Sequence, residues 1–593
     1  MTRTILVCCG TGCIASGSLM IARALRKEVA AVGADAAVET VIKETGCNGF
    51  CENGPIVKIM PDDISYYRVK ASDALEIVGS LGKSPVERLL FIGEGGKRVK
   101  SQKENPFYRN QMKVALRNIG EIDPGDIEDY MNRGGYAALK KALSMKPEDI
   151  IAEVEKSGLR GRGGAGFPTG RKWRAAASRD DYPKYVVMNG DEGDPGAFMD
   201  RSVLEGDPHS VIEGLAICAL AIGAEKGYLY IRDEYGLALK NVQKALDDAV
   251  KAGVIGEKLS LEIVRGGGAF VCGESTALMA SIEGRVGEPR AKYIRSTTRG
   301  LWDKPTVLNN VETLANIPVI IEGGGEAFAK IGTEGSKGTK VFALVGKVKY
   351  SGLIEVPMGA TLRSIIFDIG GGVAGGRPFK AVQTGGPSGG CIPAALLDLP
   401  VDFDTLTQAG AMMGSGGMIL LDDRDCMVEV ARYYVNFLCG ESCGKCTPCR
   451  EGLRQIRNIL TDICEGRGKS GDIDTLYQLC SVLKDNSLCA LGKSAPNPVL
   501  STLRYFREEY EAHINDKYCP AGVCPKLTSF VIDEKKCKGC GACAKSCPMS
   551  AISGALKKPH SIDQDKCSVC GICRNVCSFG AIEAAKGGNR NDN

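Results

Sequence analysis

The chain has 593 residues, of which 44% are hydrophobic and 25% are charged, and its formal net charge at pH 7 is +4. This composition is globular and allows about four domains of about 150 residues each, while the nearly balanced charge argues against binding to a nucleic-acid backbone. Cysteine is abundant, at 26 copies, and we find neither a signal peptide nor an apolar run of the roughly 18 residues that cross a membrane; we therefore expect a cytoplasmic protein whose grouped cysteines hold metals.

Residues 1–95 show the pattern of a small α/β domain. Strand-like runs at Thr4–Val7 and Ala37–Lys43 lie on either side of a helix-like stretch at Leu19–Ala30, which is the order of a βαβ unit. The polar, glycine-rich stretch 93–97 that follows is predicted to be a linker.

Two cysteine pairs follow these strand-like runs, Cys8 with Cys13 and Cys47 with Cys51. Two thiolates for each of two irons is the ligand set of a [2Fe–2S] cluster, so we predict one here. Structural zinc and a redox dithiol are the alternatives, although a dithiol prefers a Cys-x2-Cys spacing that this segment lacks. Cys9 is an alternative ligand to Cys8, and the turn favours Cys8 if Cys9 points inward.

Residues 96–335 contain four loops rich in glycine, asparagine or acidic residues. These loops are Gly161–Phe167, Asn189–Gly196, Gly266–Ser275 and Asn309–Thr313. Glycine lets backbone N–H groups approach an anionic ligand closely, and Lys172 adds a cation for a phosphate. The first loop satisfies G-x-G-x-x-G, but the residues before it, Ile150–Leu159, are helix-like, so it is not the usual Rossmann entry. Each loop alone is more often a plain turn; together they predict one cofactor pocket.

Residues 336–425 carry short β-type runs with glycine-rich turns, which fits a small β-rich domain, and from 426 to 530 the pattern becomes helical. Within the helical part, Cys443, Cys446 and Cys449 follow one another at Cys-x2-Cys-x2-Cys spacing. Three cysteines at this spacing bind one corner of a [4Fe–4S] cluster, and Cys489 is the best candidate for the fourth ligand. Structural zinc on the same four cysteines is the alternative.

A zinc site is predicted between the helical region and the C-terminal module. His513, Cys519 and Cys524 supply three ligands, and Cys464 is our choice for the fourth, with Cys480 as its competitor. Three cysteines and one histidine form a standard closed structural site; unliganded cysteines in a hinge are the alternative. The remaining cysteines are expected to be small buried hydrophobic residues: Cys218, Cys272, Cys391, Cys426 and Cys439.

Residues 531–593 contain the strongest signal, the bacterial ferredoxin run Cys-x2-Cys-x2-Cys-x3-Cys written twice. In such a pair the fourth cysteine of each run reaches the other cluster. One [4Fe–4S] cluster is therefore predicted on Cys537, Cys540, Cys543 and Cys577. The second is predicted on Cys567, Cys570, Cys573 and Cys547. A pair of zinc ribbons is the alternative, but zinc ligands come in separated pairs.

Several of these segments resemble the NADH-binding flavoprotein subunit of respiratory complex I, over about residues 125–510. The segments are Gly161–Phe167, Asn189–Pro195, Cys272–Glu274, Asn309–Thr313 and Glu441–Arg450. The N-terminal part resembles the thioredoxin-like [2Fe–2S] partner of that subunit, here fused to it. With the added ferredoxin pair, the layout resembles the beta subunit of multi-subunit [FeFe]-hydrogenases, electron-bifurcating ones included, and the diaphorase subunit of NAD(P)-dependent formate dehydrogenases.

The resemblance implies a multidomain α/β and α+β fold. The expected domains are a thioredoxin-like [2Fe–2S] domain (1–95), an FMN- and NAD(P)-binding α/β domain (96–335), a ubiquitin-like β-grasp domain (336–425), a helical bundle (426–530) and a two-cluster ferredoxin domain (531–593). The residues expected around FMN are Gly161, Arg162, Gly163, Gly164, Gly166, Lys172, Asn189, Asp191, Glu192, Gly273, Glu274, Ser275, Asn309 and Asn310. Phe167 is expected against the nicotinamide side, and the catalytic candidates are Glu192, Asp194 and Glu274.

Three departures from the respiratory subunit bear on the choice between NAD and NADP. Asp194 and Ser275 stand where that subunit has glutamates, and Lys292, Arg295 and Arg299 stand near a segment that is apolar and aromatic there. Fewer carboxylates and more cations favour a 2′-phosphate, but the same changes also fit a subfamily difference, so both dinucleotides stay open.

The sequence thus predicts a diaphorase subunit that exchanges hydride with NAD(P)(H) through FMN and single electrons with one [2Fe–2S] and three [4Fe–4S] clusters, with one zinc in addition. The expected partners are a catalytic hydrogenase subunit, or a formate dehydrogenase in the alternative, a small thioredoxin-like [2Fe–2S] subunit, and ferredoxin. An electron-transfer scaffold without flavin and a zinc-rich nucleic-acid-binding protein are the competing hypotheses.

Overall fold

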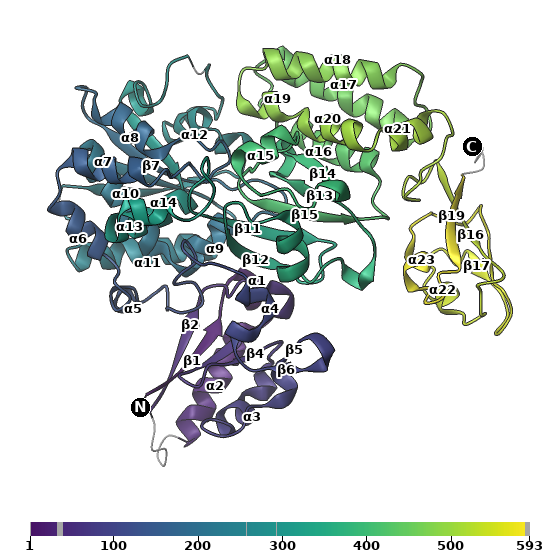
Figure 1. Ribbon diagram of the computed structural model, residues 1–593, viewed down its shortest axis with the longest axis horizontal. Coiled ribbons are helices and arrows are strands. Elements are labelled where there is room, and N and C mark those ends of the chain that lie inside the picture. Colours follow the sequence, from purple (N-terminus) through teal and green to yellow (C-terminus); the bar gives the residue numbers. More distant parts are fainter. Residues whose placement is uncertain (1, 33–38, 257, 292, 587–593) are drawn as a thin grey trace. The chain divides into compact units, whose positions relative to one another are not determined.

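The computed structural model of the chain describes residues 2–32, 39–256, 258–291 and 293–586 (Figure 1). The chain divides into two compact units. The first consists of Met1–Gly376, Gln383–Gly386 and Ala395–Leu420. The second consists of Arg377–Val382, Pro387–Ala394 and Leu421–Asn593.

The N-terminal part of the first unit is a small mixed sheet with the strand order β2-β1-β3-β4. Strand β1 pairs in parallel with β2 and antiparallel with β3, which confirms the predicted βαβ start. Apolar side chains of β1 and α2 build its core, among them Ile5, Val7, Ile21 and Leu25. The elements are β1 (Arg3–Cys8), α1 (Thr11–Ala15), α2 (Ser18–Val32), β2 (Thr40–Thr45), β3 (Val57–Met60), β4 (Ile64–Tyr66) and α3 (Ala74–Gly79).

The glycine-rich stretch 93–97 is not the predicted linker. It is the turn of a hairpin between β5 (Phe91–Ile92) and β6 (Arg98–Val99), closed by a hydrogen bond from Gly93 N to Lys97 O at 2.8 Å. Gly95 and Gly96 have positive φ, which glycine adopts without strain, and this explains why the turn is rich in glycine. A glycine cluster therefore marked a local turn and not a domain boundary.

The central part of the first unit is a parallel sheet with the strand order β10-β7-β8-β9. Its strands are β7 (Tyr185–Gly190), β8 (Lys226–Arg232), β9 (Ser260–Gly266) and β10 (Thr306–Asn310). Helix α4 (Pro106–Arg109) comes before this part of the chain; the helices around the sheet are α5 (Ile127–Met131), α6 (Ala137–Leu143), α7 (Pro147–Lys156), α8 (Thr169–Ala177), α9 (Met199–Gly206), α10 (Pro208–Ile222), α11 (Gly236–Lys251), α12 (Ser275–Ile282), α13 (Val311–Gly323) and α14 (Gly325–Ala329).

Helix α10 shows how the sequence builds this core. Asp207 accepts a hydrogen bond from Ser210 N and Pro208 occupies the first turn, while Gly223 ends the helix with a left-handed φ of 73°. Almost every residue between them is buried, and the helix is apolar on all sides, as a helix in the core of a large domain is. It packs on α13 and on β7 (Figure 1).

The β-rich part follows, as predicted. Strand β11 (Thr339–Gly346) pairs antiparallel with β12 (Gly352–Pro357) and in parallel with β15 (Gly417–Asp422). The other elements here are β13 (Phe379–Thr384), β14 (Gly390–Pro393) and α15 (Phe403–Gln408). The division between the two units falls within this part of the chain, at residues 377–421.

The second unit contains a helical bundle, in which α16 packs on α17 and α20, and α17 packs on α18. Its helices are α16 (Met427–Glu441), α17 (Thr447–Cys464), α18 (Asp472–Asn486), α19 (Ala490–Ser494), α20 (Asn497–Tyr505) and α21 (Arg507–Ile514). A small module with two similar halves follows, in which β16 pairs with β19 and β17 with β18. Its elements are β16 (Thr528–Ile532), α22 (Ala542–Lys545), β17 (Ile552–Ser553), β18 (Ser561–Ile562), α23 (Ile572–Val576) and β19 (Ile582–Lys586).

Within the described residues, every helix is too short or too polar to serve as a membrane span.

Candidate functional site

The parallel sheet has a point at which the chain reverses its direction of winding. From β7 the chain proceeds to β8 and β9 on one side, and then returns to add β10 on the other side of β7. In open α/β sheets, ligands bind in the crevice at the carboxyl ends of the strands at such a switch point. Asn189, the next-to-last residue of β7, pairs in register with Asn310, the last residue of β10, so two of the predicted loops meet at this crevice.

The glycine loop 161–167 is closed on itself and packs against the start of α13. Gly161 N donates to Phe167 O at 2.9 Å, and Arg160 bridges to Pro168. A methyl group on Gly163 would lie 3.0 Å from the Cβ of Asn310, and Gly164, with φ of 118°, lies against the backbone of Gly414. Only glycine allows these approaches. The loop follows helix α7, as predicted, and not a strand.

Contrary to our expectation, the side chain of Arg162 does not face the crevice. It is fully buried, and its guanidinium donates to the carbonyl oxygens of Arg160, Lys337 and Thr339 at 2.6–3.0 Å. Burial lowers the Arg162 pKa to about 10. Its role is to hold the glycine loop on β11, while the backbone N–H of Arg162 is held by the hydroxyl of Thr313 at 2.8 Å.

The two glutamates of the acidic loops cap helices. Glu192 accepts hydrogen bonds from the backbone N–H groups of Met199, Asp200 and Arg201 at the start of α9. Glu274 likewise accepts from Thr276 N and Ala277 N at the start of α12. Carboxylates are favoured at helix N-termini because the N–H groups there have no partner within the helix. Both glutamates therefore shape the crevice by fixing the helices at its wall.

Asp194 has a different environment from the capping glutamates. It is half-buried and accepts a hydrogen bond from the hydroxyl of Ser415 at 2.6 Å. Burial raises the pKa of Asp194 to about 6, and the Ser415 hydrogen bond opposes this shift only in part. Gly386 lies against its carboxylate, and a methyl group there would be 2.7 Å from the carboxyl carbon. Asp194 is thus the catalytic candidate whose protonation changes near neutral pH.

Hydrogen bonds tie the predicted loops together at the crevice. Asn189 donates to the carbonyl oxygen of Gly273 at 3.0 Å and accepts from Asp191 N at 2.9 Å. The neighbouring Ser275 hydroxyl donates to Glu274 at 3.2 Å. Asn310 donates to Asp200 at 2.5 Å. The structure therefore brings the four loops predicted from the sequence to one edge of one sheet.

Three other predicted residues also lie at this edge, and each of them already interacts with a neighbouring group of the protein. Lys172 Nζ donates to the carbonyl oxygen of Leu308 at 2.8 Å, next to Asn309 on β10. Asp191 is buried, with its carboxylate 3.7 Å from the guanidinium of Arg232 at the end of β8. Phe167 has the guanidinium of Arg295 over its ring, 5.6 Å from the ring centroid. Lys292 lies outside the described residues.

The environment of Asn309 shows whether the crevice suits a flavin. Its side chain is buried, and within the described part of the chain its Oδ1 atom has no hydrogen-bond partner, while Nδ2 donates to the Cys218 sulfur at 3.7 Å. A buried polar atom without a partner costs about 1–3 kcal/mol, which a ligand that donates a hydrogen bond removes. A flavin ring offers such a donor, and the glycine cradle leaves room for backbone contact with a phosphate. The residues present fit FMN.

The four predicted cysteines of the N-terminal domain converge. The sulfur of Cys8 is 3.3 Å from that of Cys13, and the sulfurs of Cys47 and Cys51 are 3.8 Å apart. Hydrogen bonds from Cys13 and Cys47 lower the pKa of Cys8, which favours the thiolate that metals bind. Cys9 points away, toward the Ser18 hydroxyl at 3.6 Å, and burial raises its pKa to about 12. The structure therefore selects Cys8 over Cys9.

The cysteines of the helical bundle are also grouped as predicted. Cys446 precedes α17 and Cys449 lies in its first turn, while Cys489 precedes α19. Gly492 of α19 packs against Cys449, where a methyl group would be 3.1 Å from its Cβ. The pKa of Cys449 is raised to about 11, mainly by burial; a hydrogen bond with Ser442 opposes the shift, and the charges of Cys446, Cys489 and Cys443 add to it. The four predicted cysteines therefore lie in the same part of the bundle, around the starts of α17 and α19.

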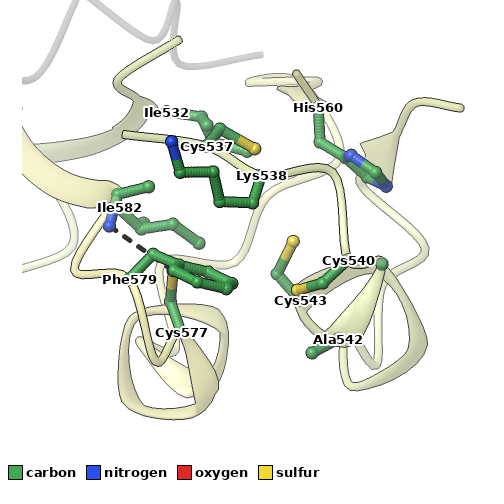
Figure 2. Close-up of a pocket in the computed structure, with 12 residues that line it drawn as sticks. Ile532, Cys537, Lys538, Cys540, Ala542, Cys543, His560, Cys577, Phe579 and Ile582 are labelled. Atoms are coloured by element: carbon green, nitrogen blue, oxygen red, sulfur yellow. Dashed lines mark hydrogen bonds between the residues drawn. The ribbon is translucent and has the colours of Figure 1, made fainter. Parts of the chain in front are cut away.

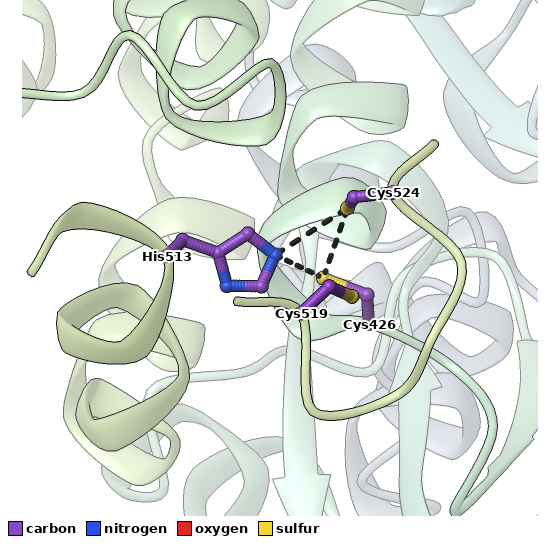
Figure 3. Close-up of side chains that lie close together, drawn as sticks. All are labelled: Cys426, His513, Cys519 and Cys524. Carbon is purple, nitrogen blue, oxygen red and sulfur yellow. Dashed lines mark hydrogen bonds between the residues drawn. The ribbon is translucent and has the colours of Figure 1, made fainter. Parts of the chain in front are cut away.

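The predicted zinc ligands are corrected at one position. A tight group in the second unit consists of Cys426, His513, Cys519 and Cys524, all buried, with ligand atoms within 4.8 Å of one another (Figure 3). His513 Nε2 lies 3.4 Å from the Cys426 sulfur and 3.3 Å from the Cys524 sulfur. Cys426, expected to be a small hydrophobic residue, takes the place that we had assigned to Cys464. Cys464 is also buried and forms a hydrogen bond with Cys524, but it does not belong to the four residues whose ligand atoms all lie within 4.8 Å of one another.

The ring of His513 is oriented for metal binding. Its Nδ1 is 2.6 Å from the carbonyl oxygen of Glu509, one turn earlier on α21. A hydrogen bond donated by Nδ1 fixes the tautomer that leaves Nε2 free as a ligand, as in many zinc sites. Cys426 immediately precedes α16, and its place beside His513 follows from packing of α16 on α21, which spacing along the sequence does not reveal.

The C-terminal module forms two pockets, one for each predicted cysteine set. One pocket is lined by Cys537, Cys540, Cys543 and Cys577 (Figure 2). The other is lined by Cys547, Cys567, Cys570 and Cys573. The fourth cysteine of each run thus crosses to the other pocket, as the ferredoxin spacing predicts. His560 and Lys538 also line the first pocket, a feature that cysteine spacing did not indicate.

The structure adds residues that the sequence patterns missed. Ser415 and Gly414 come from a loop more than 200 residues after Asp194, and Gly386 belongs to another late glycine-rich turn. Such turns could have been noticed by their glycine content, but nothing local connects them to the crevice. Their meeting with the earlier loops is a result of the fold of the first unit.

Three segments of the chain match known families. Residues 154–319 match the Nuo51 FMN-binding domain, residues 429–513 the NADH-ubiquinone oxidoreductase-F iron–sulfur binding region, and residues 530–584 a 4Fe-4S dicluster domain. These segments contain the crevice, the cysteine group of the helical bundle and the two-pocket module.

Similar proteins extend over most of the chain. It is 53% identical over 459 residues to the NADP-reducing hydrogenase subunit HndC of Solidesulfovibrio fructosivorans, covering 76% of this chain and 94% of that protein. It is 45% identical over 415 residues to the F 2 subunit of NADH-quinone oxidoreductase from Rhizobium meliloti (strain 1021), covering 69% and 99%. A crystal structure of an NAD+-reducing [NiFe]-hydrogenase in the H2-reduced state is similar with a TM-score of 0.61 and 30% identity, covering 86% and 84%.

Proposed function

The chain belongs to the family that contains the F subunits of NADH-quinone oxidoreductase and the NADP-reducing hydrogenase subunit HndC, and from this premise we propose that it is the diaphorase subunit of a multi-subunit redox complex. It is an oxidoreductase subunit with an FMN domain and 4Fe-4S domains. The observation that carries the proposal is the crevice at the switch point, where Asn189, Asn309 and the glycine loop meet.

The reaction class follows from the cofactors. When bound, FMN accepts a hydride from a nicotinamide and releases the two electrons one at a time, which an iron–sulfur cluster requires. The protein's own part is positioning: the glycine loop admits a phosphate, Asn309 Oδ1 accepts a hydrogen bond from the ring, and the capped helices α9 and α12 hold the wall of the crevice. No general base is needed for this chemistry.

The cysteine groups support the electron-transfer half of the proposal. We assign a [2Fe–2S] cluster to Cys8, Cys13, Cys47 and Cys51, and a [4Fe–4S] cluster to Cys443, Cys446, Cys449 and Cys489. We assign two further [4Fe–4S] clusters to the two pockets of the C-terminal module. A structural zinc on Cys426, His513, Cys519 and Cys524 completes the set. Thiolates held as metal ligands suit the reducing cytoplasm.

The partner that we favour is the catalytic subunit of a hydrogenase. The 53% identity to a hydrogenase subunit over most of the chain supports it, and an [FeFe]-type hydrogenase that also exchanges electrons with ferredoxin would use the added C-terminal module. A formate dehydrogenase complex is the alternative. Electrons that leave one flavin can reach more than one chain of clusters, and such an arrangement permits electron bifurcation. Bifurcation is therefore the most specific form of our proposal.

NADP is the dinucleotide that we favour, on the evidence of Arg295. Its guanidinium lies over Phe167, the residue expected against the dinucleotide, and it is exposed and therefore free to move onto a phosphate. Changing Arg295 to Ala should raise KM for NADPH at least about tenfold, the usual effect of losing one charged contact, and leave KM for NADH nearly unchanged. Equal effects on both would instead make Arg295 a general dinucleotide contact.

The proposed function is tested with the chain purified without oxygen. We expect one FMN, about fourteen iron atoms per chain and NAD(P)H-dependent reduction of a viologen dye. Asn309→Leu should lower the FMN content severalfold. Asn316→Leu is the matched control, because Asn316 is also buried with an unpartnered Oδ1 among the described residues but lies within α13, away from the crevice. Flavin-free protein, or equal flavin loss in both variants, would refute the assignment.

A further inference from the structure

Two polar groups beside the N-terminal cysteines are buried without a partner. Among the described residues, neither the hydroxyl of Tyr108 nor Nδ2 of Asn48 has a hydrogen-bond partner. Asn48 directly follows Cys47, and its backbone N–H already donates to the Cys8 sulfur at 3.4 Å. A buried donor without an acceptor costs about 1–3 kcal/mol, so such donors mark places where an acceptor is missing.

The ring of Tyr108 is fixed by an aromatic cluster around Phe50, which lies between Cys47 and Cys51 in the sequence. Phe50 stacks on Phe107 at 4.2 Å with an interplanar angle of 5°. Tyr108 meets both rings edge-on, at 6.1 Å from Phe50 and 5.2 Å from Phe107. Because packed aromatic pairs resist rotation, the hydroxyl is held in one place.

Phe50 belongs to the loop between Cys47 and Cys51, so the Tyr108 ring packs against the loop that carries two of the thiols. After burial, the influences that raise the pKa of Tyr108 include the charges of Cys8 and Cys47. Tyr67 belongs to the same aromatic cluster but differs in this respect. Its hydroxyl accepts a hydrogen bond from Asn105 Nδ2 at 3.1 Å, and no cysteine is among the causes of its raised pKa.

A positive charge lies behind the Tyr108 ring. Lys113 Nζ is 5.5 Å from the ring centroid. The nearest carboxylates are used elsewhere, since Glu121 pairs with Lys58 at 2.7 Å and Glu355 accepts from the backbone N–H groups of residues 114–116. The Lys113 charge is therefore available to act on the cysteine group and on the Tyr108 hydroxyl.

We infer that Tyr108 donates a hydrogen bond to a sulfur of the [2Fe–2S] cluster and that, with Lys113, it raises the reduction potential of that cluster. The inference rests on the proposed function, which places the cluster on Cys8, Cys13, Cys47 and Cys51. When the cluster takes one electron from NAD(P)H oxidation, it gains one negative charge and no proton moves. A hydrogen-bond donor and a nearby cation stabilise the reduced form more than the oxidised form.

Within the described chain no carbonyl, carboxylate or cysteine sulfur reaches the Tyr108 hydroxyl, so the acceptor that we propose is an inorganic sulfide of the cluster. The inorganic sulfides of a negatively charged cluster bound by the assigned cysteines are acceptors of this kind. Tyr108 is therefore a positioning and tuning residue: it contacts the cluster and does not take part in hydride transfer.

The test is a redox titration of the complete holoprotein followed by electron paramagnetic resonance, at a temperature where [4Fe–4S] signals have broadened and the [2Fe–2S] signal remains. Tyr108→Phe should shift the [2Fe–2S] midpoint to a more negative potential, with the iron content unchanged. Lys113→Met should shift it in the same direction, and Lys113→Arg should restore it. Tyr67→Phe, which removes a partnered hydroxyl from the same aromatic cluster, should leave the midpoint unchanged.

The possible outcomes distinguish a failure of this inference about Tyr108 from a failure of the proposed cluster assignment. A wild-type [2Fe–2S] signal whose midpoint is the same in Tyr108→Phe overturns this inference and leaves the proposed function intact. Equal shifts in Tyr67→Phe and Tyr108→Phe also overturn it, because they would reflect a general loosening of the aromatic cluster. Wild-type protein that contains iron but gives no [2Fe–2S] signal overturns the cluster assignment itself.

Discussion

At the scale of single residues, Asp194 is the group in the crevice whose charge changes near neutral pH. Burial raises its pKa to about 6, so the carboxyl is protonated below that pH and negative above it. An added negative charge repels the phosphates of a dinucleotide. We therefore predict that the Kd for NADH increases as the pH rises from about 5 to about 7, and that Asp194→Asn makes the Kd independent of pH in this range.

Isothermal titration calorimetry of the holoprotein measures this Kd at each pH. Asp404→Asn is a suitable control, because Asp404 is an exposed aspartate of the same unit that pairs with Arg160 at 3.1 Å. If Asp194→Asn keeps the wild-type pH dependence, another group controls dinucleotide binding, and Glu192 would be the next candidate because the charge of Asp194 acts on it.

The second prediction at this scale concerns the fourth zinc ligand. Cys426→Ser should remove most of the zinc and lower the thermal stability, because the remaining residues leave one ligand position without sulfur. Cys464→Ser should retain zinc, since Cys464 contacts Cys524 but is not one of the four grouped residues, and Cys480→Ser should behave like the wild type. Elemental analysis of the zinc content per chain distinguishes the two candidate ligands. Loss of zinc in Cys464→Ser together with retention of zinc in Cys426→Ser would show that Cys464, the residue expected from the sequence, is the fourth ligand.

Single residues also show the limit of sequence reasoning. Cysteine spacing identified the ligands of the paired-cluster module because the eight cysteines lie within 41 residues of chain, Cys537 to Cys577. Cys426 and His513 are separated by 87 positions and meet through packing of α16 on α21. Spacing cannot reveal such a pair, so Cys426 was expected to be a plain hydrophobic residue.

At the scale of secondary-structure elements, the capping of α9 yields a prediction. Glu192 accepts three backbone N–H groups at the start of this helix. Glu192→Gln keeps one acceptor oxygen and should cost about 1 kcal/mol of stability, while Glu192→Ala should cost about 2 kcal/mol or more. If capping is its role, the rate of dye reduction per bound flavin should stay near the wild-type value in Glu192→Gln.

Chemical denaturation gives the stability, and flavin content normalises the rate. Glu283→Gln provides a comparison, because Glu283 follows α12 and pairs with Arg285, away from the capping position. A stable Glu192→Gln protein with a rate per flavin reduced a hundredfold or more would make Glu192 part of the chemistry, as the sequence had led us to expect.

Elements with strong local patterns were predicted well, and tertiary relations between them were not. The runs at Thr4–Val7 and Leu19–Ala30 became β1 and α2 because apolar periodicity acts locally. Arg162 was expected at a ligand, yet its side chain holds the glycine loop on β11. Whether an arginine faces a ligand or three carbonyl groups depends on residues 337–339, far along the chain.

At the scale of the whole molecule, the two units divide the proposed work. The flavin crevice and the N-terminal cysteines belong to the first unit, and the bundle and ferredoxin-like cysteines belong to the second. Under the proposed function, hydride exchange depends on residues of one unit, and delivery of electrons to a protein acceptor depends on cysteines of the other. Damage to the C-terminal module should leave the first activity in place.

We predict that Cys570→Ser separates these activities. The substitution removes one ligand from the second pocket of the C-terminal module, whereas the crevice residues are untouched. NADH-dependent reduction of a small dye that reacts at the flavin should stay within about twofold of wild type, while reduction of ferredoxin should fall at least about tenfold, because a site that has lost a thiolate ligand no longer holds a cluster of the required potential. Cys439→Ser, in a cysteine of α16 outside the assigned ligand groups, should change neither rate. Ferredoxin reduction at the wild-type rate in Cys570→Ser would mean that electrons leave the chain by a route that bypasses the C-terminal module.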